Sequence, residues 1–328
     1  MSVPLAVIYK FFDDQGNYLS ATLTYYAFIA IFPTLLLASS ILGFVLQGGD
    51  ELQEEILNSA LAQFPIIGDQ LGRPEGLQGS TGGVIVGAAA ALYGAMGLGQ
   101  AIQNTMHVAW SVPRNSRPNP FYQRFKSLLL LLTAGMAVLA VSVVSAVGSN
   151  TQVFSEEVDI GLRWLINLVT VLVVGCVLAL LLRTAAAGHL SFFRAAPGAF
   201  AVAVMWQVLQ YLGTLYVARV LVGANDMNQT FGLVLGLIGI IYLGSVMAVL
   251  GIEINVVLAE RLYPRALLAP FTDDVELTDA DRRAYAGYAR AQRHKGFEVV
   301  EVRFADHDQT DNPHDTEPDQ RPDERPAP

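Results

Sequence analysis

Residues 231–252 read FGLVLGLIGIIYLGSVMAVLGI, a run without a single Asp, Glu, Lys or Arg. A helix needs about 20 apolar residues to cross roughly 30 Å of hydrocarbon, so this run predicts a membrane-spanning helix. Five further uncharged stretches pass the same test. The predicted spans are residues 22–46, 82–107, 128–147, 165–182, 198–217 and 231–252. We therefore expect an all-α polytopic membrane protein built as a bundle of six transmembrane helices.

The composition favours the same class of protein. Of the 328 residues, 53% are hydrophobic and 15% are charged, against about 25% charged residues in an average soluble domain. The net charge of −9 comes with no clustered basic surface, which argues against a nucleic-acid partner. The single cysteine, Cys176, excludes an intrachain disulfide. No phosphate-binding loop, HExxH pair or GxSxG elbow occurs, so we expect no metal, no cofactor and no enzyme.

The loops predict an orientation, because Lys and Arg close to a span are retained in the cytoplasm. Alternate loops are basic, and the loops between them are acidic. The basic positions next to predicted spans are Arg114, Arg117, Arg124, Lys126, Arg183, Arg194, Arg261 and Arg265. Six spans with this alternation predict a plasma-membrane protein with both termini in the cytoplasm.

Two segments lie outside the spans. Residues 51–66 have apolar positions at helical spacing and predict a short extracytoplasmic amphipathic helix, which we interpret as a cover of the bundle in preference to a functional lid. In the tail, Thr278 and Asp281 predict a helix start, and Gly296 is the expected stop. Residues 297–304 could form a strand. The predicted divisions are a spanning domain at 1–262, a cytoplasmic tail at 263–304 and a disordered acidic, Pro-rich end at 305–328.

Polar residues within spans are the places to look for function, because an uncompensated polar group in hydrocarbon costs several kcal/mol. Three faces stand out, on the spans at 82–107, 198–217 and 231–252, with two tyrosines from the first span. The candidates for a substrate path or polar cavity are Tyr25, Tyr26, Gln100, Gln103, Asn104, His107, Gln207, Gln210, Tyr211, Glu253 and Asn255. These groups could line one hydrated cavity open to the cytoplasm. Alternatively, the amides only hydrogen-bond helix to helix, and Glu253 marks the boundary of its span.

Small residues suggest where helices approach closely. Gly83 with Gly87, and Gly232 with Gly236, have the small-xxx-small spacing, and we interpret them as packing sites between the second and sixth spans. Pro33 removes a backbone hydrogen bond from the first span and predicts a kink there.

Several stretches resemble the YihY/BrkB family of multipass inner-membrane proteins. The sequence LSATLTYYAFIAIFP at 19–33 is similar to the family's first-helix signature, and RAAPG at 194–198 and GIEINVV at 251–257 are similar to later blocks. The resemblance covers about residues 5–262. The family usually has Tyr at Phe231 and often Ala at Ile252. The tail run YARAQRHKGF at 288–297 is similar to the end of actinobacterial members.

The resemblance implies a six-helix membrane protein associated by name with virulence and serum resistance and once labelled a ribonuclease. The ribonuclease label fits poorly, because such an enzyme needs clustered acids or histidines with basic RNA contacts. Some relatives have been linked with lipid export, so the leading hypothesis is a transporter or flippase-like exporter of an amphiphilic, lipid-like substrate. The alternative is a membrane scaffold or envelope-integrity factor that recruits partners through its tail. The expected partners are the lipid bilayer, a lipid-like substrate and further copies of the chain in a homo-oligomer.

Overall fold

The computed structural model describes residues 2–45, 81–119, 121–130, 133, 160–186, 190–216, 226–266 and 276–304. All regular structure in these ranges is helical. Three helices among them are long and apolar enough to cross a membrane, over Leu168–Ala185, Phe192–Gly213 and Leu235–Ala259. The all-α membrane fold is confirmed, while the number of six spans stays a prediction. The helix expected at 51–66, most of the span at 128–147 and the tail from 305 lie outside the described residues.

Five long helices cover the predicted spans that the structure describes. They are α2 (Gly16–Val45), α5 (Thr81–Ala109), α7 (Ile160–Ala185), α8 (Phe192–Tyr216) and α9 (Asp226–Ala259). Each is longer than predicted, because helices continue past the last uncharged residue wherever a polar side chain finds a partner or reaches the surface. Helix α9 continues beyond Glu253 to Ala259, so this acid lies inside the helix.

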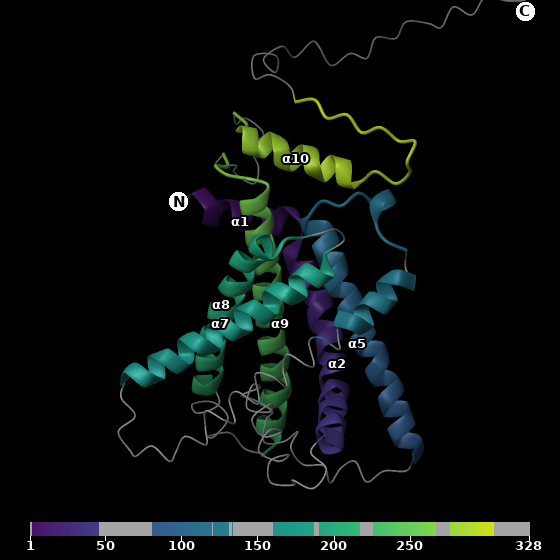
Figure 1. Cartoon of the computed structure of the whole chain (residues 1–328), viewed down its shortest axis with the longest axis vertical. Helices are drawn as coiled ribbons and strands as arrows, with labels where there is room; N and C mark the ends of the chain where they lie inside the picture. The colour runs from purple at the N-terminus through teal and green to yellow at the C-terminus, as the bar shows by residue number, and fades with distance from the viewer. Residues whose placement is uncertain are drawn as a thin grey trace, which may run out of the picture.

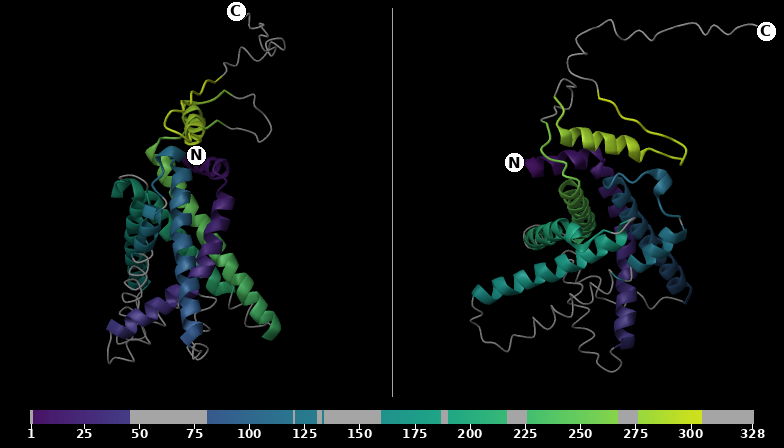
Figure 2. Two further views of the ribbon diagram at one scale, coloured as in Figure 1. Left: turned by 90° about the vertical axis from the view of Figure 1, so that its right-hand side faces the viewer. Right: turned by 45° about the horizontal axis from the view of Figure 1, so that its top comes forward.

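The helices form a loose bundle in which α2 packs on α5 and α9, and α8 packs between α7 and α9 (Figure 1). Large apolar side chains remain on the outside; Leu172, Val208 and Leu235 are 47%, 54% and 53% exposed. In water such a surface would be unfavourable, but hydrocarbon solvates it. Helix α2 stays helical through Pro33 and bends along its length, as the predicted kink requires (Figure 2).

Helices α8 and α9 approach each other closely where they cross, at Gly198 and Gly251. A Cβ added to Gly198 would lie 1.8 Å from the Gly251 carbonyl oxygen. One turn further along α9, Asn255 accepts a hydrogen bond from the Gly198 N–H (2.7 Å) and donates one to the Ala195 carbonyl (3.0 Å). These bonds flank Pro197, which lies inside α8 and cannot donate a backbone hydrogen bond.

The glycine pairs singled out in the sequence do not make this crossing. A Cβ added to Gly232 meets no atom within 4 Å, and Gly83 and Gly87 fall where the structure describes no side chains. Helix α5 instead uses Gly94 and Gly97, which pack on Ile29 and Tyr26 of α2. The predicted packing of Gly232 and Gly236 on Gly83 and Gly87 stays a prediction, because spacing alone does not say which face of a helix meets a neighbour.

An additional helix, α1 (Ser2–Asp13), was not predicted from the sequence. It lies across one end of the bundle, beside the first turns of α2 and the last turns of α9 (Figures 1 and 2). Ala6, Val7 and Phe11 are buried in the bundle, whereas Ile8 and Phe12 are 48% and 62% exposed. This amphipathic pattern is typical of a helix at a membrane interface.

The tail helix α10 (Asp279–Ala291) lies over α1 at the same end of the bundle (Figure 1). Its predicted start is confirmed, because Thr278 and Asp281 form a capping box. The helix ends at Ala291, before Gly296, and residues 297–304 are not a strand. The buried Ala284 joins α10 to the main hydrophobic core, so this part of the tail is packed on the spanning bundle and is not separate from it.

The basic residues that predicted the orientation gather at this end. Arg114 and Arg117 follow α5, Arg183 lies in the last turn of α7, Arg194 in the first turn of α8, and Arg261 after α9. Helices α1 and α10 lie at this end as well (Figure 2). The first and the last described helices, α1 and α10, therefore lie at the same end of the bundle, which is the arrangement that an even number of membrane crossings requires.

Replacing Gly198 with Ala should destabilise the protein by about 3 kcal/mol, since the new methyl group would meet backbone rather than a movable side chain. The matched control is Gly239→Ala, because a Cβ there meets no atom within 4 Å and the change should stay within about 0.5 kcal/mol. Unfolding of both variants in the same detergent measures the difference. Equal stability of the two variants would contradict the close crossing.

Candidate functional site

Glu253 is fully buried at the basic end of the bundle, where α9 meets α1. Its Oε2 lies 3.6 Å from Nζ of Lys10, which in turn is 2.6 Å from Oδ2 of Asp14. Lys10 and Glu253 are 1% and 0% exposed, and Asp14 is 7% exposed. Neither oxygen of Glu253 accepts a hydrogen bond from a donor in the described part of the chain. We call Lys10, Asp14 and Glu253 the buried charge cluster.

The cluster holds two carboxyl groups and one ammonium group, so its charges do not cancel when all three are ionised. Burial raises the pKa of Asp14, and the nearby Lys10 only partly opposes this effect. The cluster therefore favours holding a proton on one of its two acids.

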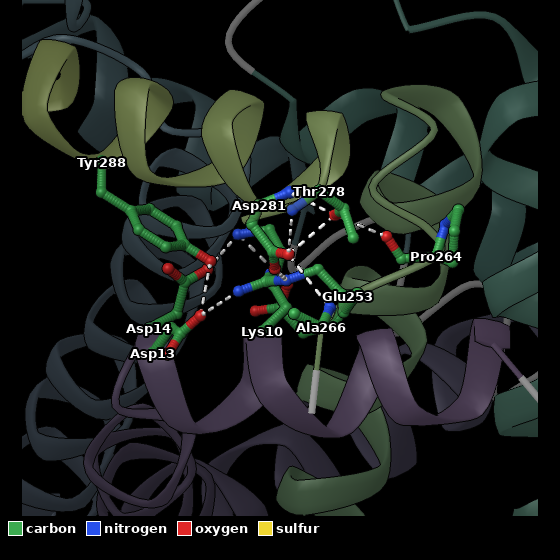
Figure 3. A network of polar contacts seen from close by, with 10 residues as sticks. Lys10, Asp13, Asp14, Glu253, Pro264, Ala266, Thr278, Asp281 and Tyr288 are labelled. Carbon is green, nitrogen blue, oxygen red and sulfur yellow. Dashed lines mark hydrogen bonds and ion pairs between the residues drawn. The ribbon is translucent and has the colours of Figure 1, made fainter. Parts of the chain in front are cut away.

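A second network fixes α10 above the cluster (Figure 3). The buried Arg265 guanidinium forms an ion pair with Asp281 through Nε and Oδ1, and its Nη2 lies 3.3 Å from Asp13 of α1. The second oxygen of Asp281 accepts hydrogen bonds from the backbone N–H groups of Ala266 and Thr278, both at 3.0 Å. Asp281 thus connects the cap of α10 to the segment after α9. Through Arg265 it is also connected to α1.

Tyr288 of α10 joins this network to the buried charge cluster. Its hydroxyl donates to Asp13 (3.2 Å), and Nζ of Lys10 lies 5.0 Å from the centre of its ring. Burial raises the pKa of Tyr288, and the neighbouring aspartates act in the same direction, so this phenol stays protonated. Beside it, a cleft of about 710 Å³ separates α10 from the ends of α5 and α9. Its lining includes Lys10, Trp110, Glu260, Arg283 and Tyr288.

The polar face predicted on α5 divides between two roles. Gln103 is 2% exposed, and its amide nitrogen lies 2.8 Å from the hydroxyl of Ser127, 3.1 Å from the carbonyl of Gln123 and 3.2 Å from that of Gly99. These contacts join α5 to the helical residues 121–130. Gln103 therefore links two helices, as in the alternative interpretation that the amides hydrogen-bond helix to helix.

The remaining polar residues of α5 line a pocket of about 360 Å³. Its walls are Gln100, Asn104, His107, Arg114, Arg117, Pro118, Asn119 and Gln123. Arg117 donates to the amide oxygen of Asn104 (3.4 Å). We call this the polar pocket. It combines amide groups with two guanidinium groups, which suits an anionic group.

The candidates on α2 and α8 lie elsewhere. Tyr26 packs between α2 and α5, and Tyr25, at 58% exposure, stands against it edge to face. Gln207 and Gln210 are half-buried on α8, and Tyr211 is 71% exposed. The amide group of Asn255 is hydrogen-bonded to α8 at the crossing of α8 and α9. The polar pocket includes none of these residues and does not include Glu253, so the structure distributes the predicted site over several places.

The residues that pair with Glu253 were missed from the sequence. Lys10 and Asp14 precede the first predicted span, where charged residues are ordinary, and nothing local indicates that they are buried. A usable signal was their spacing with apolar residues, since Ala6, Val7, Lys10 and Phe11 form one helical face. The described residues contain no group of three His, Cys, Asp or Glu placed to hold a metal ion.

Replacing Asp281 with Ala should release α10, because it leaves the buried Arg265 without its partner and removes the helix cap. Breaking a buried ion pair costs about 3–5 kcal/mol, so hydrogen exchange of the α10 amides should accelerate at least about a hundredfold. Asp279→Ala, at an exposed position of the same first turn, is the control and should change exchange little. Unchanged hydrogen exchange of α10 in Asp281→Ala would show that the contacts of Asp281 do not hold the helix in place.

The same contact predicts an acid limit. Burial alone would raise the pKa of Asp281, but the hydrogen bonds from Thr278, Ala266 and Arg265 hold it below its ordinary value of 3.8. A carboxyl with a lowered folded pKa stabilises the fold above its unfolded pKa and loses that contribution as the pH falls through the folded value. Above pH 3.8, the contribution of Asp281 to the protection of α10 against protease should therefore be constant. It should fall below that pH, and Asp281→Asn should lack this step.

The family model described as "Virulence factor BrkB" matches residues 7–274. The match includes α1 from Val7 onward, all the long helices and the segment after α9 that carries Arg265. No curated protein and no solved structure matches the chain.

Proposed function

Because this chain belongs to the Virulence factor BrkB family, we propose that it is a multi-pass plasma-membrane protein that moves an amphiphilic, lipid-like substrate with an anionic head group. The observation that carries the proposal is the polar pocket. It lies among the last turns of α5 and the basic loop that follows, where two arginines, His107 and several amides face one hollow. Guanidinium and amide groups are suited to phosphate and carboxylate ligands.

The surroundings of the pocket suit the other half of such a substrate. The adjoining helical residues 121–130 expose Phe121, Tyr122 and Phe125, which are 79%, 60% and 68% exposed. Aromatic side chains at the end of a membrane bundle favour the boundary between head groups and acyl chains. A lipid-like molecule could place its charged head in the pocket and its chains beside these rings.

The proposed orientation puts this end of the bundle, with α1 and α10, in the cytoplasm. The supporting feature is the gathering of arginines at the helix ends on this side, because basic residues next to spans are retained in the cytoplasm. The proposal assigns a route for a substrate and no catalytic step.

A second candidate is a scaffold that recruits cytoplasmic partners, and the tail supplies its specific support. After α10, Phe297 and Val299 are 85% and 91% exposed, and exposed apolar residues on a polar tail are typical of binding segments. Deleting all residues from 266 onward would not distinguish the two functions, because it also removes Asp281, the partner of the buried Arg265. A truncation after residue 296 keeps α10 and separates the two functions cleanly.

Purified protein in vesicles that contain fluorescent anionic and zwitterionic lipids tests the transport proposal. Arg117→Gln should slow leaflet exchange of the anionic lipid about tenfold, since one charge-assisted hydrogen bond contributes about 1.5–3 kcal/mol. The control is Arg124→Gln, an exposed arginine of the same basic stretch that does not line the pocket. Truncation after residue 296 should leave exchange intact. Exchange no faster than in protein-free vesicles, or equal exchange by both arginine variants, would refute the proposal.

A further inference from the structure

We propose that Glu253 is a proton-binding site, which takes up one proton from water in the cleft beneath α10. The inference concerns the buried charge cluster and is independent of the polar pocket. It assigns a role to Glu253, which is fully buried on α9 and whose oxygens have no hydrogen-bond donor in the described part of the chain.

The first argument is the charge count. With Lys10, Asp14 and Glu253 all ionised, the cluster carries one uncompensated negative charge at 7% exposure or less. Such a charge in an apolar interior is strongly unfavourable, and a buried group takes up a proton instead. One proton on the two carboxyl groups brings the cluster to neutrality.

Geometry assigns the proton to Glu253. Asp14 has the ammonium group of Lys10 at hydrogen-bonding distance, 2.6 Å, whereas Glu253 lies 3.6 Å from it. Neither oxygen of Glu253 has a hydrogen-bond donor in the described part of the chain. A buried carboxylate without a donor is the less stable of the two anions, and protonation of Glu253 removes the charge that lacks one.

The other charged and titratable groups around the site fit this assignment. From α10, Tyr288 covers Lys10, and Asp13 and Arg265 lie at the outer edge of the same network. Arg265 is paired with Asp281 and Asp13, so it supplies no free positive charge to Glu253. Among the described residues, Lys10 is therefore the cation that acts directly on Glu253.

The cleft gives the proton a route. Lys10 and Tyr288 form part of its wall, and Lys10 contacts both acids of the cluster. A proton from water in the cleft can reach the acids after a small movement of the Lys10 side chain. Since α1, α9 and α10 all meet at the cluster, gain or loss of this proton changes the electrostatic balance at their junction.

Infrared difference spectroscopy of the full-length protein in lipid nanodiscs tests the proposal without any transport assay. A protonated carboxyl in apolar surroundings gives a carbonyl stretch separate from that of carboxylates. Near neutral pH, the protein should show this band, Glu253→Gln should lack it, and the control Glu260→Gln, an exposed acid of the same cleft, should keep it. A band that is missing from the unmodified protein, or that persists in Glu253→Gln, overturns the proposal.

Two further variants keep the test decisive if Glu253→Gln fails to fold. Asp14→Asn removes the second negative charge, so Glu253 should remain ionised beside Lys10 and the band should disappear. Lys10→Met removes the cation, so both acids should be protonated and the band should roughly double. A band unchanged in both variants overturns the proposal.

Discussion

An acid on a membrane-embedded helix needs a partner, and this constraint organises the basic end of the bundle. Glu253 is fully buried within α9. The ammonium group that approaches it comes from α1, far away in the sequence. Because charge is so costly in apolar surroundings, the short helix α1 is held against the end of α9, and the family match includes α1 from Val7 onward. The tail helix α10 then closes over Lys10 through Tyr288.

The polar residues of the helices serve separate purposes. Asn255 supports the crossing of α8 and α9 next to Pro197, and Gln103 joins α5 to the helix that follows it. The residues at the end of α5, in contrast, face the polar pocket together with Arg114 and Arg117. A membrane protein can use the same residue types for packing and for binding. The distinction depends on whether a side chain's hydrogen-bonding groups are already occupied.

The sequence was sufficient for features set by local physics. Long uncharged runs predicted α7, α8 and α9, and the pair Thr278 and Asp281 predicted the start of α10, because hydrophobic length and capping act within one segment. It was not sufficient for contacts between distant segments. Lys10 carries no local sign of burial, and the close crossing at Gly198 and Gly251 depends on which faces meet. Similarly, the pairing of Glu253 could not be predicted, because its partner Lys10 lies on α1.

We propose that the buried charge cluster helps to bring α1 and α10 together at one end of the bundle and that this end lies in the cytoplasm. Labelling of single cysteines with a membrane-impermeant maleimide tests it most directly, with Cys176→Ser as the background. Phe12→Cys on α1 and Arg282→Cys on α10 are both exposed positions. We expect that neither cysteine is labelled in intact cells and that both are labelled in inside-out vesicles. Labelling of either cysteine from outside intact cells would contradict it.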